Sequence, residues 1–289
     1  MPEDEDKYPA ESGRRRFVKG VVGSAALASV GTGTAASLNA ATSPSGAGGG
    51  PTQYIGIENT DGPAPRGMPM VPLEIENGEL KGMWPDVETQ TVSGREVKIA
   101  EMDVGGVTYS STWYQYCGVQ TYEGAQPDAD QDNFFRVASG SPYDWMGDLE
   151  PGSKLTVDLF DDYKEWGNGI GRSGLGKPAM SSWRSQGDVK TMPVQILRSP
   201  EVSKMANGEG KYSELPGPVQ NFIKAATADD FMAWLDKCTH FCCVPAFKAF
   251  PGSAKFDGED VVYCQCHQSL YDPFSPVQKQ FIALPRPDE

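Results

Sequence analysis

Two short boxes of cysteine and histidine hold the residues best suited to chemistry. The first box is Cys-Thr-His-Phe-Cys-Cys over residues 238–243, and the second is Cys-Gln-Cys-His-Gln-Ser over residues 264–269. The 289-residue chain has only two histidines, and each box contains one of them. Two thiolates and two imidazoles in the spacings C-x-H and C-x-x-H suit a zinc ion or a [2Fe–2S] cluster with mixed ligands. The sequence therefore predicts a metal centre.

The two boxes resemble the cluster-binding motifs of Rieske iron–sulfur proteins, which read C-T-H-L-G-C and C-P-C-H-G-S-x-Y. The resemblance covers residues 231–274, and the loop between the boxes is longer than is usual in the family. Over the rest of the chain it extends only to a high content of predicted strand. The matching residues are Cys238, Thr239, His240 and Cys243 in the first box and Cys264, Cys266, His267, Ser269 and Tyr271 in the second.

The resemblance implies a ligand for each iron of a [2Fe–2S] cluster. Cys238 and Cys264 would bind one iron, and His240 and His267 would bind the other. With two thiolates instead of four, the oxidised site carries less negative charge, so the reduction potential rises to about −150 to +300 mV. The two histidines would be the catalytic residues, because an imidazole beside a reduced centre becomes more basic and links proton uptake to electron uptake.

The resemblance also implies roles for four residues that flank the ligands. Cys243 and Cys266 would form a disulfide that joins the two loops, worth about 3 kcal/mol in the loop-entropy model. Ser269 and Tyr271 would donate hydrogen bonds to a bridging sulfide and to a ligating cysteine. Such bonds stabilise the more negative reduced form and raise the potential further.

The sequence departs from the family motif at several positions. Phe241 and Cys242 replace Leu-Gly, and Gln265 and Gln268 replace Pro and Gly. The stretch after Tyr271 lacks the family's G-P-A-P loop. Cys117 and Cys242 remain without an assigned partner, so they either pair with each other or stay as buried free thiols.

Two other metal chemistries need to be considered for the boxes. A Cys2His2 zinc site that only clamps two loops has the same ligand types. The extra cysteine in each box, the two hydroxyl residues and the export signal described below favour iron and sulfur. A Rieske oxygenase needs two further histidines and a carboxylate for its catalytic iron, and the chain has no further histidine.

The N-terminal region reads as an export signal. Residues 13–19, Gly-Arg-Arg-Arg-Phe-Val-Lys, fit the twin-arginine pattern, and an uncharged run follows over residues 20–41. We expect residues 1–41 to be a signal or an uncleaved membrane anchor. The rest of the chain would then lie on the extracytoplasmic face. This export route carries folded proteins, which suits a cluster inserted in the cytoplasm.

Charge limits the classes of partner. The chain has 39 acidic and 25 basic residues and a net charge of −14, so nucleic acid is excluded as a partner. The acidic residues are spread along the chain rather than gathered in a tail. An acidic surface keeps a protein hydrated in concentrated salt, as in halophiles, although an ordinary exported protein can also be acidic.

Organisation after the signal follows from turn residues and hydrophobic patterns. Residues 42–50 read as a flexible linker with an r.m.s. reach of about 17–19 Å. Residues 51–289 read as one all-β Rieske domain, with a cluster-binding subdomain near 236–275 and one helix over Pro218–Ala226. The predicted strands are Tyr54–Ile57, Met70–Ile75, Arg95–Met102, Val107–Tyr116, Phe134–Ala138, Lys154–Phe160, Met192–Arg198, Phe231–Cys238, Val261–Cys264 and Phe281–Leu284.

Two further motifs are best explained as loops. Residues 169–174 match G-x-G-x-x-G, but Pro178 stands where a nucleotide-binding loop needs Ser or Thr, and no apolar helix follows. Asp128, Asp130 and Asp132 offer oxygen ligands for a cation, but a solvated acidic loop is the better explanation.

Together these features predict an electron-transfer protein. The leading hypothesis is the iron–sulfur subunit of a membrane quinol-oxidising complex of the cytochrome bc kind. It would take electrons from quinol beside a cytochrome b-type subunit and pass them to an outer-face cytochrome or blue-copper protein. The alternative is the small Rieske subunit of an exported oxidoreductase of the arsenite-oxidase type.

Overall fold

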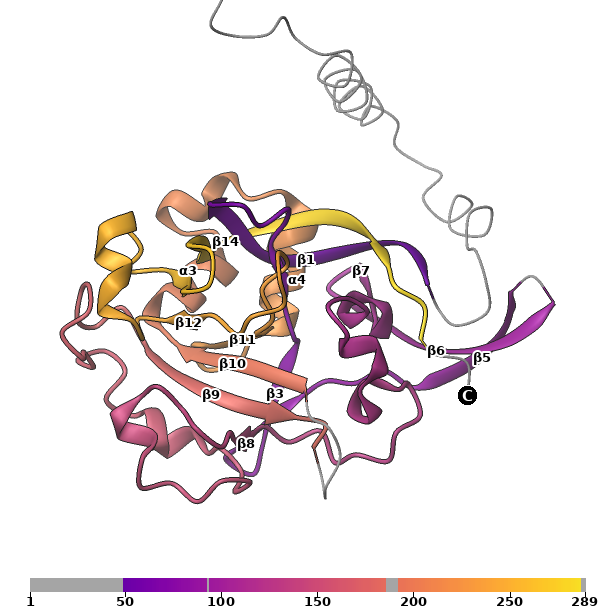
Figure 1. Ribbon diagram of the computed structural model, residues 1–289, viewed down its shortest axis with the longest axis horizontal. Coiled ribbons are helices and arrows are strands. Elements are labelled where there is room, and N and C mark those ends of the chain that lie inside the picture. Colours follow the sequence, from indigo (N-terminus) through magenta and orange to yellow (C-terminus); the bar gives the residue numbers. More distant parts are fainter. Residues whose placement is uncertain (1–48, 93, 186–191, 287–289) are drawn as a thin grey trace, which may run out of the picture. The chain divides into compact units, whose positions relative to one another are not determined.

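The computed structural model describes residues 49–92, 94–185 and 192–286. The predicted signal over residues 1–41 and nearly all of the linker over residues 42–50 lie outside this part of the chain. Within it the fold is mostly β, as predicted, with antiparallel pairing in every sheet (Figure 1). No helix of the described residues is long and apolar enough to cross a membrane.

The largest sheet has five strands in the order β12-β13-β14-β1-β2. Its longest strand pairing joins β1 to β14 and runs from Gly50 opposite Ala283 to Asp61 opposite Leu270. A bulge interrupts this pairing after Ile57, where the partner residue jumps from Pro276 to Asp272. The strands span Gly50–Asp61 (β1), Met68–Pro69 (β2), Ala246–Phe247 (β12), Val262–Cys264 (β13) and Ser269–Ala283 (β14).

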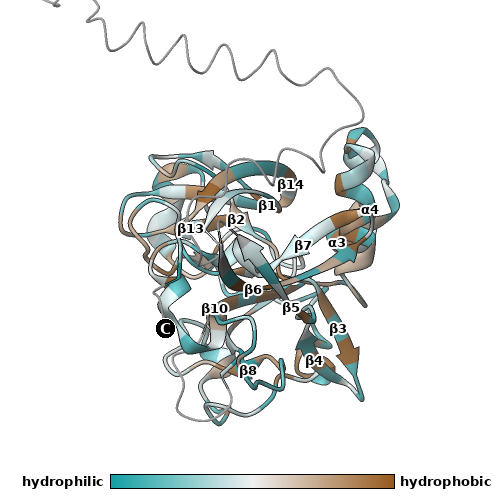
Figure 2. Ribbon diagram, turned by 90° about the vertical axis from the view of Figure 1, so that its right-hand side faces the viewer, coloured by the Kyte–Doolittle hydropathy of each residue, from teal (hydrophilic) through white to brown (hydrophobic). Residues whose placement is uncertain are grey.

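A second sheet has four strands in the order β11-β10-β9-β8. Every residue of β11 is buried, and Figure 2 shows hydrophobic colour along β10. The two sheets meet where Val71 donates its backbone N–H to the carbonyl of Ala233, 2.9 Å away. The strands span Arg136–Val137 (β8), Lys177–Trp183 (β9), Met192–Arg198 (β10) and Phe231–Leu235 (β11).

Smaller elements complete the fold. Two small sheets are formed by Leu73–Glu76 (β3) and Glu79–Gly82 (β4), and by Val87–Val92 (β5), Arg95–Val104 (β6) and Val107–Ser110 (β7). The α-helices are Pro200–Asn207 (α3) and Gly217–Ala226 (α4). Short 3-10 helices span Ser111–Tyr114 (η1), Val119–Thr121 (η2), Glu123–Ala125 (η3), Asp144–Met146 (η4), Val157–Phe160 (η5), Gly210–Glu214 (η6) and Pro251–Phe256 (η7).

The predicted helix is confirmed as α4, and its apolar face is buried as expected. Val219, Phe222, Ile223 and Ala226 are each at most 1 % exposed. Spacing of three and four residues places these side chains on one side of the helix, where they pack into the core. Helix α3 was not predicted, although it carries a Ser199 cap and a proline at its start.

Three predicted strands differ most from the structure, and two others, over Phe134–Ala138 and Phe231–Cys238, are shortened to β8 and β11. The strand over Val107–Tyr116 ends at Ser110, whose hydroxyl accepts the backbone N–H of Thr112 and caps η1. The segment Lys154–Phe160 makes only isolated bridges before it turns into η5. The strand over Met70–Ile75 is reduced to an isolated bridge at Met70 and the start of β3, because Pro72 interrupts it.

The glycine-rich loop and the acidic loop, the two further motifs noted in the sequence, both have structural roles. In the glycine-rich loop, the backbone N–H of Arg172 donates to Asp260 at 2.8 Å, and a side chain at Gly171 would collide with the same carboxylate. In the acidic loop, Asp128 is paired with Lys98 at 2.5 Å and Asp132 is paired with Arg136. These contacts explain both motifs without a nucleotide or a cation.

Close packing of β1 against β2 leaves no room for a side chain at Gly56. A Cβ at Gly56 would meet the backbone carbonyl of Met68, which cannot rotate away. We expect Gly56→Ala to lower the free energy of unfolding by about 1–3 kcal/mol, the range for overpacked sites. Gly217→Ala is the control, because it faces open space at the start of α4 and should leave stability equal or slightly higher. Chemical denaturation of both variants measures the difference.

Candidate metal centre

The second cysteine–histidine box forms the turn of a β-hairpin. Cys264 is the last residue of β13, and it pairs with Ser269, the first residue of β14. Gln268 closes the turn by donating its backbone N–H to the carbonyl of Cys264 at 2.9 Å. Its φ of +59° is left-handed, a conformation that glycine adopts more easily. The hairpin therefore fixes the positions of Cys264 and Ser269 on either side of the exposed His267.

The first box lies where the chain crosses from the second sheet to the first. It follows β11 and precedes β12, and it closes on itself through two backbone hydrogen bonds. Cys238 donates its N–H to the carbonyl of Cys243 at 2.8 Å, and Cys242 donates to the carbonyl of Cys238 at 3.1 Å. Cys242 has a φ of +63°, again left-handed. This compact turn presents His240 and Phe241.

The fold brings the two boxes together. Cys243 and Cys266 form the disulfide that the family resemblance implied, with their Cα atoms 6.7 Å apart. The rings of His240 and His267 lie edge to face, with centroids 4.9 Å apart and an angle of 78° between their planes. Residues that are 27 positions apart in the sequence thus form one cluster.

The cysteines divide into thiols and half-cystines. The sulfur atoms of Cys243, Cys264 and Cys266 lie within 4.8 Å of one another, but the first and last are joined to each other. A disulfide sulfur is not a thiolate and is a poor metal ligand, so this trio does not form a three-cysteine site. Cys238 and Cys264 are the two free cysteines of the described chain, and both are buried.

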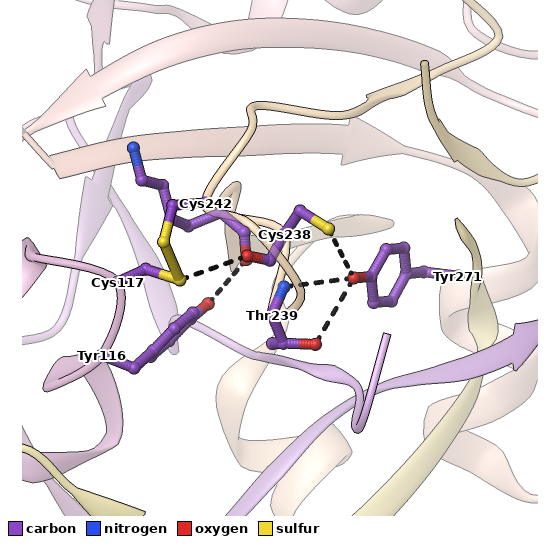
Figure 3. The surroundings of a disulfide bond; sticks show 7 residues. Tyr116, Cys117, Cys238, Thr239, Cys242 and Tyr271 are labelled. Atoms are coloured by element: carbon purple, nitrogen blue, oxygen red, sulfur yellow. Dashed lines mark hydrogen bonds between the residues drawn. A yellow bond between two sulfur atoms is a disulfide. The ribbon is translucent and has the colours of Figure 1, made fainter. Parts of the chain in front are cut away.

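A tyrosine from β14 contacts the first two residues of the first box. The Tyr271 hydroxyl donates to the sulfur of Cys238 at 3.2 Å and accepts the backbone N–H of Thr239 at 3.2 Å (Figure 3). Thr239 in turn donates its hydroxyl to the carbonyl of Arg66 at 2.6 Å. Tyr271 is fully buried, so its hydroxyl has a fixed place beside the sulfur.

The two free thiols hold their protons unequally. The Cys264 thiol, acting as donor toward Cys238, is the main cause that lowers the pKa of Cys238 to about 5, and Tyr271 adds to this effect. The same interaction raises the pKa of Cys264. Burial and the proximity of Cys238 raise the pKa of Tyr271 as well, so its hydroxyl stays protonated and remains a donor. Cys238 is thus prepared to act as a thiolate.

Each box contains a side chain with a buried hydrogen-bonding group that is unused within the described residues. Nδ1 of His240 is buried and has no hydrogen-bond partner among the described residues. The Ser269 hydroxyl accepts the backbone N–H of Ala64 at 3.2 Å, and its own hydrogen goes to no atom of the described chain. Buried polar atoms are normally satisfied. An imidazole nitrogen and a hydroxyl donor left open beside two thiols fit a metal–sulfide group.

A buried acid stands just before the first box. Asp236 is 0 % exposed, and neither of its carboxyl oxygens has a hydrogen-bond partner among the described residues. Burial raises the pKa of this carboxyl well above its ordinary value, which favours the neutral acid. The neutral form adds no negative charge behind the thiols.

The two remaining cysteines also form a disulfide. Cys117 is bonded to Cys242 across 125 positions of sequence (Figure 3). Of the two possibilities that the sequence left open, pairing is therefore correct. Sequence analysis missed Ala64 and Arg66, whose backbone atoms support Ser269 and Thr239. Backbone contacts of this kind have no motif that could reveal them.

Lys248 lies in the long connection between the boxes and binds it to the glycine-rich loop. Its ammonium group donates to the carbonyl of Arg172 at 2.5 Å and to the carboxylate of Asp260 at 3.1 Å. Asn168 donates to the carbonyl of Lys248 at 2.6 Å. These hydrogen bonds join the glycine-rich loop to the connection between the boxes.

Comparison with known proteins adds no relative. No protein family model matches the chain, and neither a curated protein nor a solved structure matches it. Functional conclusions for this chain therefore rest on its own residues and their arrangement.

The unequal thiols give a measurable titration. In metal-free protein with both disulfides intact, we expect one thiolate to form near pH 5 while the second thiol stays protonated past its ordinary pKa of 9.0. Tyr271→Phe removes a donor that stabilises the thiolate, so the lower pKa must rise. Ultraviolet thiolate absorbance against pH measures both values. Tyr163→Phe is the control, because that hydroxyl bonds to Asp230 and not to a cysteine; an equal shift in both variants would contradict the assignment.

Proposed function

We propose that this protein holds a Rieske-type [2Fe–2S] cluster and transfers electrons as the iron–sulfur subunit of a membrane quinol-oxidising complex of the cytochrome bc kind. The observation that carries the proposal is the convergence of two buried free thiols and two adjacent imidazoles on loops joined by a disulfide. Cys238 and Cys264 would hold one iron, and His240 and His267 the other. When bound, such a cluster accepts one electron at a potential of about −150 to +300 mV.

The pairing of thiols with thiols and of imidazoles with imidazoles favours a two-iron centre over a single zinc ion. A structural zinc site draws four ligand atoms around one point. Apart from the disulfide-containing trio, no group of three cysteine, histidine or acidic ligand atoms lies that close together in the described chain. Two separate pairs suit a group that has two metal atoms with sulfides between them.

Backbone conformation at the departures from the motif supports the same proposal. The family motifs have glycine at the positions occupied here by Cys242 and Gln268. Both residues adopt left-handed φ values, +63° and +59°, which glycine adopts without strain. The turns therefore have the conformation that the motif glycines would favour, although the residues differ. This agreement does not depend on the ligand residues.

The surroundings of the ligands fit electron and proton transfer. Tyr271 donates to the Cys238 sulfur, and the Ser269 hydrogen is free to be donated, so both would stabilise added negative charge. His267 is exposed and His240 is half-buried, so an imidazole can meet a hydroxyl of quinol at the surface. Phe241 beside them is 65 % exposed and Val244 is 40 % exposed, which gives the imidazole edge an apolar surround.

Metal analysis of the purified full chain tests the proposal directly. We expect two irons and two acid-labile sulfides per chain, and a Rieske-type EPR spectrum after reduction. Cys264→Ser should abolish the spectrum, whereas Ser203→Ala in α3, outside both boxes, should keep it. Stoichiometric zinc with no EPR signal would show that the site is structural.

The Tyr271 hydroxyl should tune the reduction potential. Tyr271→Phe removes one hydrogen bond to the Cys238 sulfur, an interaction worth about 1–1.5 kcal/mol. For a one-electron couple this corresponds to a fall of about 40–60 mV. Potentiometric titration of the reduced-state EPR signal measures the shift. An unchanged potential would show that the hydroxyl does not act on the cluster ligand.

The electron-transfer partner is a separate question, and a second candidate must be distinguished from the first. Phe241 and Cys242 replace the motif's Leu-Gly beside His240, so this surface differs from the family pattern where quinol would bind. That difference also suits the small Rieske subunit of an exported oxidoreductase of the arsenite-oxidase type. Purification from native membranes separates the two: a cytochrome b-type subunit favours the first, and a molybdenum subunit favours the second.

A further inference from the structure

We propose that Tyr116 and Cys117 form a clamp that positions the first box, and with it His240 and Phe241, through a second disulfide and two contacts to the box's start. The clamp comes from the segment between η1 and η2, which belongs to neither cysteine–histidine box. The inference rests on the proposed function for its spectroscopic readout only. Its structural readout is independent of any metal.

The clamp touches both the start and the end of the first box (Figure 3). The Tyr116 hydroxyl donates to the carbonyl of Lys237 at 2.9 Å. The Cys117 sulfur lies 3.4 Å from the carbonyl oxygen of Cys238 and is bonded to the sulfur of Cys242. In the disulfide this sulfur carries no hydrogen, so its approach to the carbonyl is a packing contact and not a hydrogen bond. Two consecutive residues therefore contact Cys238 and Cys242 in the box and Lys237 just before it.

The clamp is itself firmly supported. Tyr116 is only 5 % exposed, and the guanidinium of Arg66 lies 4.3 Å from the centre of its ring. Arg66 also accepts the Thr239 hydroxyl through its backbone carbonyl at 2.6 Å. The same arginine thus contacts the clamp with its side chain and the box with its backbone. Movement of the clamp would disturb the box from both sides.

The consequence falls on the two residues between the held points. The Phe241 ring is mostly exposed, so core packing does not fix it. Its centroid nevertheless lies 4.3 Å from that of His240 and 5.1 Å from that of His267. Cys242 and Cys243 follow it directly and are bonded to different segments, Cys117 and Cys266. Covalent bonds on the next two residues therefore replace burial as the means of holding this ring against both imidazoles.

A positioning role differs from simple stabilisation in a way that can be measured. A disulfide that only restricts the unfolded chain raises the unfolding temperature and leaves the folded state unchanged. A clamp restricts local opening of the folded state, which controls the exchange of backbone amide hydrogens. It also fixes the orientation of His240, which determines the EPR spectrum of a bound cluster.

The experiment compares the full chain with two matched variants. Cys117→Ser/Cys242→Gly removes the disulfide and supplies a residue that adopts the left-handed φ without strain. Tyr116→Phe keeps both disulfides and removes only the hydrogen bond to Lys237. We expect amide exchange over residues 239–242 to rise at least about tenfold in the first variant and about fivefold in the second. Exchange over residues 265–268 should stay unchanged. With cluster bound, the EPR features should broaden in the first variant.

Each outcome has a distinct meaning. Faster exchange in the first box together with a broadened spectrum supports the clamp. A lower unfolding temperature with unchanged exchange and an unchanged spectrum would overturn it, because the disulfide would then act only on the unfolded chain. If the unmodified protein shows no Rieske spectrum while exchange still responds, the proposed function fails and the clamp stands. Peptide mapping without reduction checks the Cys117–Cys242 linkage in the same samples.

Discussion

The Cys243–Cys266 disulfide is the constraint on which the site depends, because it joins the loop that connects the two sheets to a hairpin of the five-stranded sheet. The first box follows β11 of the four-stranded sheet, and the second is the β13–β14 turn of the five-stranded sheet. Without a covalent link, relative movement of the two sheets would change the distance between His240 and His267. The disulfide therefore restricts the movement of one imidazole relative to the other.

The strand that begins at the second box also connects the site to the start of the described chain. β14 carries Ser269 and Tyr271 in its first residues, and then pairs with β1 back to Gly50. This pairing is antiparallel throughout, with register shifts after Ile57 and after Asn59. The first residues of β1 and the second box therefore belong to the same sheet.

The sequence predicted the site better than the fold around it, for physical reasons. The spacing of cysteine and histidine predicted which residues would cluster, and the resemblance to the motif implied the Cys243–Cys266 bond that the structure contains. Strand β10 was visible from its β-branched and apolar residues. Strand β9 was missed because Lys177 and Pro178 follow a glycine-rich loop, and proline usually argues against a strand. The Tyr116–Cys117 contacts depend on tertiary packing across more than a hundred residues, which no local pattern encodes.

The departures from the Rieske motif show how one backbone requirement can be met in two ways. A left-handed residue is needed at two places, and the motif uses glycine for both. Gln268 accepts the strain within a hairpin whose flanking strands fix the turn, so its neighbours hold the conformation. Cys242 lies in a box whose flanking strands, β11 and β12, do not pair with each other, and it has a disulfide to Cys117 instead. In that position a side chain that can form a covalent bond offsets the loss of glycine's freedom. It also places the exposed Phe241 beside both histidines, where a flexible glycine would leave the ring unrestrained.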